Sequence, residues 1–457
     1  MVSTERTEKQ DTAAASANGA ADSPESVSLA CTVRQAIMQQ PVWDMHTHLY
    51  PPGFGSPLAG SGAASDPKGL LLWGIDELLT YHYLVAEVFR VVPPRKLPYE
   101  QFWRMKKHEQ ADHIWKHLFL ERTPVSEACR GVLTALQRLG LDPGDRNLDG
   151  YRKWFANQDI DKHIDNAMEI AGVSRITMTN AVFDDNERLR WLENPHVGDD
   201  PRFAGVLRFD PLIRDWDSAA RALSRWGYET SAELDRSSIE SAREFLRDWI
   251  DRVNAIYCAV SLPPEFRYGG EDDRSSGSVI LRSVVLPVLE ERGLPLAMMI
   301  GSRQQVNPQL QGGGDMGGLS DVQSVVRLCA DFPNNRFLCT MLALENQHEL
   351  AVAARKFGNL MVFGCWWFLN NPSLVESITR LRVELLGTSF IPQHSDARVL
   401  EQIIYKWSHS REIIQKVMLG KYADLQSTGW NVGENDIRSD AQQMFQLNFG
   451  SFIAKDQ

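Results

Sequence analysis

The chain has 457 residues, a formal net charge of −11, 43% hydrophobic residues and 23% charged residues. This acidic balance contains no run rich in lysine and arginine, which argues against a nucleic-acid or anionic membrane partner. A few arginines can still hold a small anion. No stretch reaches the ~18 uninterrupted apolar residues of a membrane helix, and the length suits several domains or one large barrel with insertions.

The first 28 residues predict a disordered N-terminal tail. Residues 1–28 are mainly Ala, Ser, Thr, Asp and Glu, with almost nothing to bury and no basic start or apolar core of a signal peptide. The six cysteines are scattered without a Cys-x-x-Cys pair, which is typical of reduced core thiols. We therefore expect a cytoplasmic protein whose folded unit is residues 29–457.

Residues 42–48 predict a short buried strand with two imidazoles at its end. Because strand side chains alternate between faces, Asp44, His46 and His48 are expected on one face. Two imidazoles at this spacing form half of a divalent-cation site. The Pro-Pro-Gly from residue 51 ends the strand, which places the pair where barrel enzymes keep their chemistry. Ordinary half-buried histidines remain the alternative.

From about residue 74 to 170 the pattern is mainly helical. In its first helix the apolar repeat follows i, i+3, i+4, i+7 spacing and includes His82. A histidine on such a face is more often a core residue. This helix closely follows the first strand, however, so His82 and Tyr83 can also reach over the barrel mouth as an acid/base couple. The block is too long for a loop, so it predicts a helical insertion after the first strand.

Short apolar strands then alternate with helical segments. Strands joined by crossover helices predict a parallel sheet, and eight such units fit a closed (β/α)₈ barrel. The predicted strands are Val42–His48, Val173–Asn180, Phe203–Asp210, Ile256–Leu262, Leu294–Gly301, Arg336–Leu342, Leu360–Phe368 and Leu385–Ile391.

Polar residues gather where these strands end. Asp396 is a reasonable third ligand, because a carboxylate opposite two imidazoles leaves positions open for water or substrate oxygens. Arg208, Arg303 and Arg398 can grip a carboxylate through bidentate hydrogen bonds, although any one of them can simply brace a loop. The Trp366-Trp367 pair can pack in the core or form a wall for a sugar ring.

Several of these motifs occur in one order along the chain. They are His46-Thr-His48, Tyr81-His82-Tyr83, Tyr99-Glu100-Gln101-Phe102, Trp115-Lys116-His117-Leu118, Arg208-Phe209-Asp210, Gly364-Cys365-Trp366-Trp367-Phe368 and Asp396-Ala397-Arg398. In this order they resemble the uronate (glucuronate) isomerase family, a branch of the amidohydrolase superfamily of metal-dependent barrels. The resemblance extends from about residue 30 to the end of the chain.

The resemblance implies an aldose–ketose interconversion of a hexuronic acid, either glucuronate to fructuronate or galacturonate to tagaturonate. It implies that His46, His48 and Asp396 hold one divalent ion, usually zinc, with Asp396 also acting in catalysis. The implied residues around the substrate are His82, Tyr83, Arg208, Arg398, Trp366 and Trp367.

Three positions depart from the family pattern. The family has a histidine in a Leu-His-Ile-Gly strand ending, where this chain has Met299. A thioether cannot move a proton and is a poor ligand for a hard or borderline ion. The aspartate that precedes the family histidine is Tyr81 here, and a run of asparagines is replaced by residues 304–307. These differences bear on the substrate and leave the fold unaffected.

Three functions therefore stand as hypotheses. The first is the uronate isomerase; the second is a metal-dependent hydrolase or lyase of the same superfamily acting on a sugar acid or lactone, which needs no second proton shuttle and which Met299 favours. The third is a non-catalytic sugar-acid binding protein, which does not explain why both histidines and Asp396 occur together. All three predict a small-molecule sugar acid as partner, and the sequence leaves a homo-oligomer open.

Overall fold

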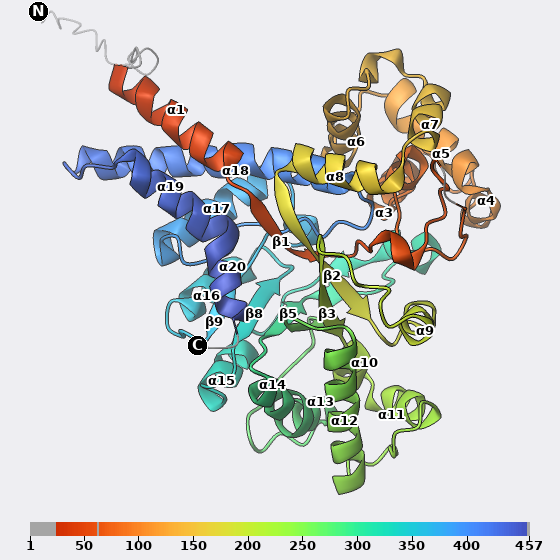
Figure 1. Cartoon of the computed structure of the whole chain (residues 1–457), viewed down its shortest axis with the longest axis vertical. Helices are drawn as coiled ribbons and strands as arrows, with labels where there is room; N and C mark the ends of the chain where they lie inside the picture. The colour runs from red at the N-terminus through yellow and green to blue at the C-terminus, as the bar shows by residue number, and fades with distance from the viewer. Residues whose placement is uncertain (1–23, 62–63, 455–457) are drawn as a thin grey trace, which may run out of the picture.

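The computed structural model describes residues 24–61 and 64–454, and its centre is a curled, parallel seven-stranded sheet (Figure 1). Neighbouring strands follow the order β1-β2-β3-β4-β5-β8-β9. Each overlaps a predicted strand, as expected for short apolar runs between crossover helices. The bounds are β1 (Val42–Thr47), β2 (Val173–Ala181), β3 (Phe203–Arg208), β4 (Cys258–Leu262), β5 (Leu296–Ile300), β8 (Phe337–Met341) and β9 (Leu360–Val362).

The eighth predicted strand, Leu385–Ile391, is wrong. Helix α17 (Pro372–Leu386) continues through Leu385, and Ile391 forms only an isolated bridge to Phe363. Residues 391–397, which we call the closing segment, still complete the ring. Ile391 N donates to Val362 O in β9, and Asp396 N donates to His46 O in β1, both at 3.0 Å. The fold is a TIM-like (β/α)₈ barrel whose eighth position is an extended segment without a regular ladder.

The chain between β1 and β2 is largely helical and forms a group beside the barrel, at the upper right of Figure 1. Its last helix, α8, leads directly into β2. The helices of this group are α2 (Ile75–Leu79), α3 (His82–Val91), α4 (Tyr99–Arg104), α5 (Lys107–Trp115), α6 (Glu127–Arg138), α7 (Leu148–Ala156) and α8 (Ile160–Ala171).

Further helices surround the sheet, and a small antiparallel hairpin of β6 (Ser302–Arg303) and β7 (Met316–Gly317) follows β5. This hairpin was not predicted. The helices, besides α17, are α9 (Asp185–Glu193), α10 (Asp210–Arg214), α11 (Trp216–Arg225), α12 (Arg236–Arg252), α13 (Ser276–Ile280), α14 (Leu286–Arg292), α15 (Val322–Asp331), α16 (Asn346–Ala354), α18 (Gln402–Ser427), α19 (Glu434–Gln442) and α20 (Asn448–Ile453).

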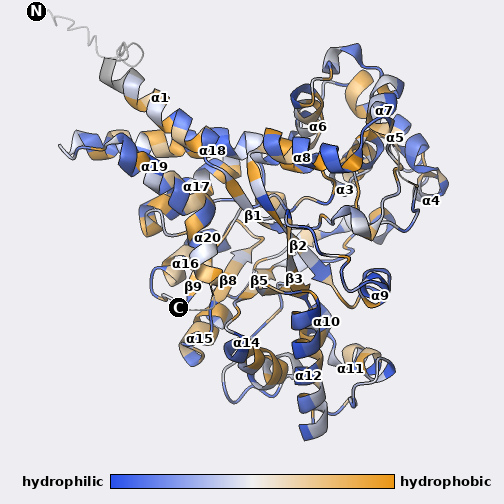
Figure 2. Cartoon of the chain, in the orientation of Figure 1, coloured by the Kyte–Doolittle hydropathy of each residue, from blue (hydrophilic) through white to orange (hydrophobic). Residues whose placement is uncertain are grey.

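The strands separate two apolar cores. In β5, Met298 packs in the outer core between sheet and helices, whereas Ala297 and Met299 face the barrel interior. This is the period-two alternation of a strand buried on both faces. Figure 2 shows apolar residues concentrated on the central strands, while the outer helices turn hydrophilic faces outward. Met299 therefore points inward at the mouth end of β5.

Helix α20 closes the barrel at the amino ends of the strands. Phe449 packs edge-on against Trp43 and Tyr257, with ring centroids at 5.0 and 6.0 Å. Arg336, just before β8, donates from Nη1 to Phe452 O at 2.7 Å and fixes the end of this helix. The carboxyl ends of the strands, at the opposite end of the barrel, are not covered by this helix and hold the candidate site.

Helix α1 (Pro24–Gln39) packs against α18 and α19 (Figure 1). The predicted tail, residues 1–28, lies outside the described residues up to residue 23, and its last residues from Pro24 onward begin α1. All six cysteines are free, and all except Cys31 are buried. Within the described part of the chain, no helix combines the length and apolar character needed to cross a membrane.

Candidate active site

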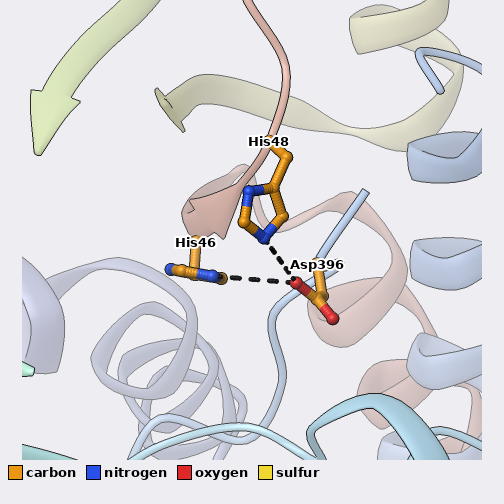
Figure 3. A group of neighbouring side chains, drawn as sticks. All are labelled: His46, His48 and Asp396. Atoms are coloured by element: carbon orange, nitrogen blue, oxygen red, sulfur yellow. Dashed lines mark ion pairs between the residues drawn. The ribbon is translucent and has the colours of Figure 1, made fainter. Parts of the chain in front are cut away.

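An imidazole in β1, a second one just after this strand and a carboxylate from the closing segment converge at the barrel mouth (Figure 3). His48 Nε2 lies 3.3 Å from Asp396 Oδ1, and His46 Nε2 lies 3.7 Å from the same oxygen. The two backbones are also joined, because Asp396 N donates to His46 O and His48 N donates to Ala397 O. Asp396 has a φ of 49°, a strained value for a residue other than glycine, which these bonds on both sides maintain.

Asp44, expected on the same face as the histidines, points to α18 instead. Its Oδ1 accepts a hydrogen bond from Ser395 N at 3.0 Å, and its Oδ2 accepts one from Trp407 Nε1 at 2.8 Å. A register shift between Asp44 and Thr47 breaks the strict alternation of β1. Asp44 therefore supports the closing segment from outside the barrel.

The His46, His48 and Asp396 side chains fit a divalent cation. Burial lowers the pKa of His46 to about 3 and that of His48 to about 4, so both imidazoles are neutral ligands near pH 7. Burial alone would raise the pKa of Asp396, but the hydrogen bond and charge of His48 outweigh it and hold that pKa below its usual range. The carboxylate therefore stays ionised.

The donor atoms also point to one position. One donor atom from each of the three residues lies within 4.8 Å of the others. His46 Nε2 is buried without a hydrogen-bond partner, whereas its Nδ1 lies 3.2 Å from Thr179 Oγ1. A ring with one nitrogen held and the other free is the arrangement of a metal-ligating histidine. Two imidazoles and one carboxylate suit zinc or another transition ion.

A cavity of about 170 Å³ lies beside this triad. Among the residues predicted from the sequence, all but Tyr83 and Arg303 line it. Ser261 in β4, and Ser302, Gly312 and Asp315 in the segment after β5, were not singled out as site residues, because no motif marks them. The lining consists of His46, His48, Tyr81, His82, Arg208, Ser261, Met299, Ser302, Gln304, Gly312, Asp315, Trp366, Trp367, Asp396 and Arg398.

The three predicted arginines have different surroundings. Arg208 lines the cavity, but its Nε and Nη2 donate to both oxygens of Asp210 at 2.5 to 3.0 Å, so its charge is compensated. Arg398 also lines the cavity and forms no ion pair within residues 24–61 and 64–454. Arg303 turns away from the cavity and pairs with Glu265 at 3.3 Å, with its side chain 49% exposed. The structure therefore does not bring Arg303 together with the other predicted site residues.

The residues at the start of α3 place an imidazole and a phenol against the cavity. His82 Nε2 is buried without a hydrogen-bond partner, and burial lowers the pKa of this ring to about 3. Tyr81 lines the cavity, with its ring 4.1 Å from that of His82. Tyr83 lies behind them, where burial raises the pKa of its hydroxyl well above the ordinary value. The structure thus brings Tyr81 and His82 to the cavity, whereas Tyr83 does not line it.

Two indoles form one wall of the cavity. Trp366 is 5% exposed and also belongs to the barrel-interior core. Trp367 has a φ of 47°, and its ring lies 5.4 Å from that of His82. A flat apolar surface beside polar groups is suited to the face of a sugar ring.

Lys406, from α18, is a buried cation beneath the site that the sequence did not reveal. Its Nζ donates to Ser395 O at 2.5 Å and lies 5.7 Å from the centre of the Tyr83 ring. Burial lowers the pKa of this ammonium. The closing segment is thus held by Asp44 at its Ser395 amide and by Lys406 at its Ser395 carbonyl.

The assembled cavity can bind a small polar anion and move a proton. The triad offers a cation site, Arg398 offers a charged donor, and His82 offers an unprotonated ring nitrogen without a hydrogen-bond partner, which burial makes a weaker base than a free imidazole. This combination suits chemistry at a carbonyl or hydroxyl beside a carboxylate.

Comparisons with known proteins place this site in a family. No protein-family model and no curated protein matches the chain. A uronate isomerase from Thermotoga maritima has a TM-score of 0.70 and 14% identity over 93% of this chain and 97% of that chain. A glucuronate isomerase from Caulobacter crescentus has a TM-score of 0.70 and 16% identity over 95% of each chain. At these identities the two structures show a common fold alone.

A third solved structure is much more similar. It is a uronate isomerase from Bacillus halodurans C-125, with a TM-score of 0.87 and 48% identity over 96% of this chain and 97% of that chain. This identity extends over nearly the whole of both chains. The chain belongs to the uronate isomerase family.

Proposed function

We propose that the protein interconverts an aldose and a ketose hexuronic acid, glucuronate with fructuronate or galacturonate with tagaturonate. One observation carries this proposal: a barrel-mouth cavity that joins His46, His48 and Asp396 occurs in a chain 48% identical to a uronate isomerase over 96% of its length. Both substrates are small anions, which the guanidinium in the cavity can bind even though the protein carries a net charge of −11.

Substrate binding in this proposal depends on Arg398 and the two indoles. Arg398 forms no ion pair within the described residues, so its guanidinium can take the uronate carboxylate in a bidentate manner. Arg208 is already paired with Asp210, so it serves better as a hydrogen-bond donor to a hydroxyl. Trp366 and Trp367 would pack against the sugar and exclude water.

Isomerisation moves a proton between C2 and C1 and builds negative charge on two oxygens. His82 Nε2 has no competing partner and its ring is neutral, so it is our proposed proton acceptor, with the Tyr81 hydroxyl beside it. Tyr83 supports this pair from behind. Asp396 stays ionised and can accept a proton from a hydroxyl. A divalent ion held by His46, His48 and Asp396 would supply positive charge beside the developing oxyanions.

One observation favours a second candidate, a metal-dependent hydrolase or lyase acting on a sugar acid or lactone. Met299 lines the cavity, where its thioether can neither donate nor accept a proton during turnover. A hydrolase needs only one proton acceptor, which Asp396 can provide. The overall identity to a uronate isomerase makes this the weaker candidate.

The test uses the purified protein, with its metal content measured, in deuterated water. We expect solvent deuterium to enter C2 of glucuronate or galacturonate, together with formation of the ketose, as followed by NMR. No exchange and no ketose with either acid would contradict the proposed isomerase. Acid release from a panel of sugar lactones and N-acyl sugar acids would then support the hydrolase.

The ion and the compartment are also part of this proposal. Zinc suits two imidazoles and a carboxylate with an open position, and elemental analysis of the protein as purified would identify it. Five buried, free cysteines suit a cytoplasmic protein.

A further inference from the structure

The two indoles of the cavity lie on a short loop, residues 364–370, which we call the tryptophan loop. It begins directly after β9 at Gly364, whose φ is 61° and whose position faces the His394 ring so closely that no Cβ fits. Trp367 also has a positive φ, of 47°. A loop with two such residues persists only when its surroundings fix it.

Two buried side chains hold this loop through its backbone. Gln393 Oε1 accepts a hydrogen bond from Cys365 N at 2.7 Å, and its Nε2 donates to Asn370 Oδ1 at 3.1 Å, so it contacts both ends of the loop. Arg382, from α17, donates from Nη1 to Gly364 O at 2.8 Å. Its Nη2 donates to Gln347 Oε1 at 2.8 Å, and Gln347 in turn donates to Met341 O at the end of β8.

Arg382 is a charged group in an environment without a counter-charge. Its side chain is 1% exposed, and it forms no ion pair within the described ranges 24–61 and 64–454. The acidic groups that act on the pKa of Arg382 are the thiols of Cys365 and Cys339, and burial raises the pKa of Cys365 to about 11, so that thiol is neutral. An isolated buried cation is destabilising, and a well-packed apolar residue would usually be more stable there. Its presence here therefore needs a reason beyond core packing.

That reason lies in the geometry of its donors. A guanidinium can donate in one plane to two acceptors, and here it joins the carbonyl of Gly364 to Gln347 at the neighbouring strand end. A methionine of similar length would leave Gly364 O and Gln347 Oε1 without this partner. The tryptophan loop would then lose one of its two buried supports.

We infer that Arg382 is a positioning residue, which sets the place of the Trp366-Trp367 wall against the substrate through the Gly364 carbonyl. For its effect on turnover this inference rests on the proposed function. Arg382 itself does not line the cavity, so it would not contact the substrate.

The chain provides a matched control in Arg411. This arginine is 3% exposed, likewise forms no ion pair within the described chain, and donates to Gly172 O and to the carbonyl of Ile37. These acceptors lie just before β2 and near the end of α1, at the closed end of the barrel. Substitution of either arginine removes the same buried chemistry, but only Arg382 is joined to the tryptophan loop.

The experiment compares Arg382→Met with Arg411→Met in the metal-loaded full chain. We expect Arg382→Met to lower kcat/KM for the uronate by about 10- to 100-fold, carried mainly by KM. We expect Arg411→Met to lower the thermal midpoint with KM unchanged. Arg382→Lys, which can still donate to Gly364 O, should recover part of the loss. Equal KM values for the two methionine variants would overturn the inference.

A second measurement does not depend on activity. In protein labelled with 5-fluorotryptophan, the Trp366 and Trp367 fluorine resonances can be assigned with Trp366→Phe and Trp367→Phe. We expect Arg382→Met or Arg382→Lys to shift or broaden these two resonances, and Arg411→Met to leave them in place. Unchanged resonances in both Arg382 variants would overturn the inference. A wild-type protein inactive on both hexuronates would instead contradict the proposed function. The fluorine spectra would still test whether Arg382 positions the tryptophan loop.

Discussion

The two ends of the barrel are built differently. At the amino ends of the strands, Phe449 packs against Trp43 and Tyr257, and the Tyr257 hydroxyl donates to Met45 O at 2.6 Å. At the carboxyl ends, His46 and His82 each leave a buried ring nitrogen without a hydrogen-bond partner, and Trp367 and Asp396 have strained backbones. Buried polar atoms without partners and strained backbones reduce stability, so packing at the closed end must compensate for the cost of the open end.

His46→Ala should have the largest effect on activity and should disturb only the carboxyl end of the barrel. Removal of one imidazole leaves too few ligands to hold the ion, so we expect metal loss and a fall in kcat of at least about 1000-fold, or ~4 kcal/mol. Elemental analysis and kinetics would check this, with the exposed His108→Ala as the control. Unchanged metal content would place the ion elsewhere.

Phe449→Ala should be the largest change at the closed end. It removes a buried ring that contacts both Trp43 and Tyr257, so we expect the free energy of unfolding to fall by about 3–5 kcal/mol. KM should stay unchanged because α20 does not line the cavity. Urea unfolding beside kinetics would test this, with Leu447→Ala, 42% exposed, as the control. A raised KM would remove the distinction between the two ends.

Arg398→Ala and Arg303→Ala compare an arginine that lines the cavity with one that lies outside it. Loss of a charged donor to the substrate carboxylate should lower kcat/KM by about 10- to 100-fold in Arg398→Ala. Arg303 forms an exposed pair with Glu265, worth about 0–1 kcal/mol, so its removal should leave kcat/KM within about twofold. Similar losses in the two variants would show that the cavity wall is assigned incorrectly.

Met299→His should have the smallest effect, and in the opposite direction. An imidazole at this interior position of β5 can exchange protons, so we expect uronate turnover to rise by about 10-fold. Met299→Leu keeps the volume and lacks a proton site, so its activity should match that of the parent. Lower isomerase activity in the histidine variant, with hydrolysis retained, would favour the alternative function.

The features that could be predicted from the sequence are those that depend on a local pattern of residues. Seven strands follow apolar runs, and the imidazole pair follows from the position of His46 and His48 at a strand end. The eighth strand was predicted wrongly, because Leu385 and Leu386 form the end of α17 and Pro392 has no amide hydrogen to donate to a ladder. Its ring position depends on bonds to β1 and β9 that form only in the closed barrel.

Side-chain direction in loops was harder to predict. Arg303 was expected in the cavity because it follows β5, but β6 and β7 form a hairpin there that turns it outward, while its neighbours Ser302 and Gln304 line the cavity. Lys406 and Arg382 lie on helices, 11 and 18 residues after the residues that they support. Their helical patterns carry no sign that they are buried beneath a strand end.

The closing segment carries both the last link of the barrel and the third cation ligand. During synthesis, a nascent chain exposes His46 and His48 long before Asp396 leaves the ribosome, and it has no complete site until residues 391–397 dock on β1. Metal affinity then stabilises only the closed ring, by mass action. The bound ion would therefore stabilise completely folded chains over incomplete ones. Under metal starvation, newly made chains would lack this stabilisation and would be more exposed to proteolysis.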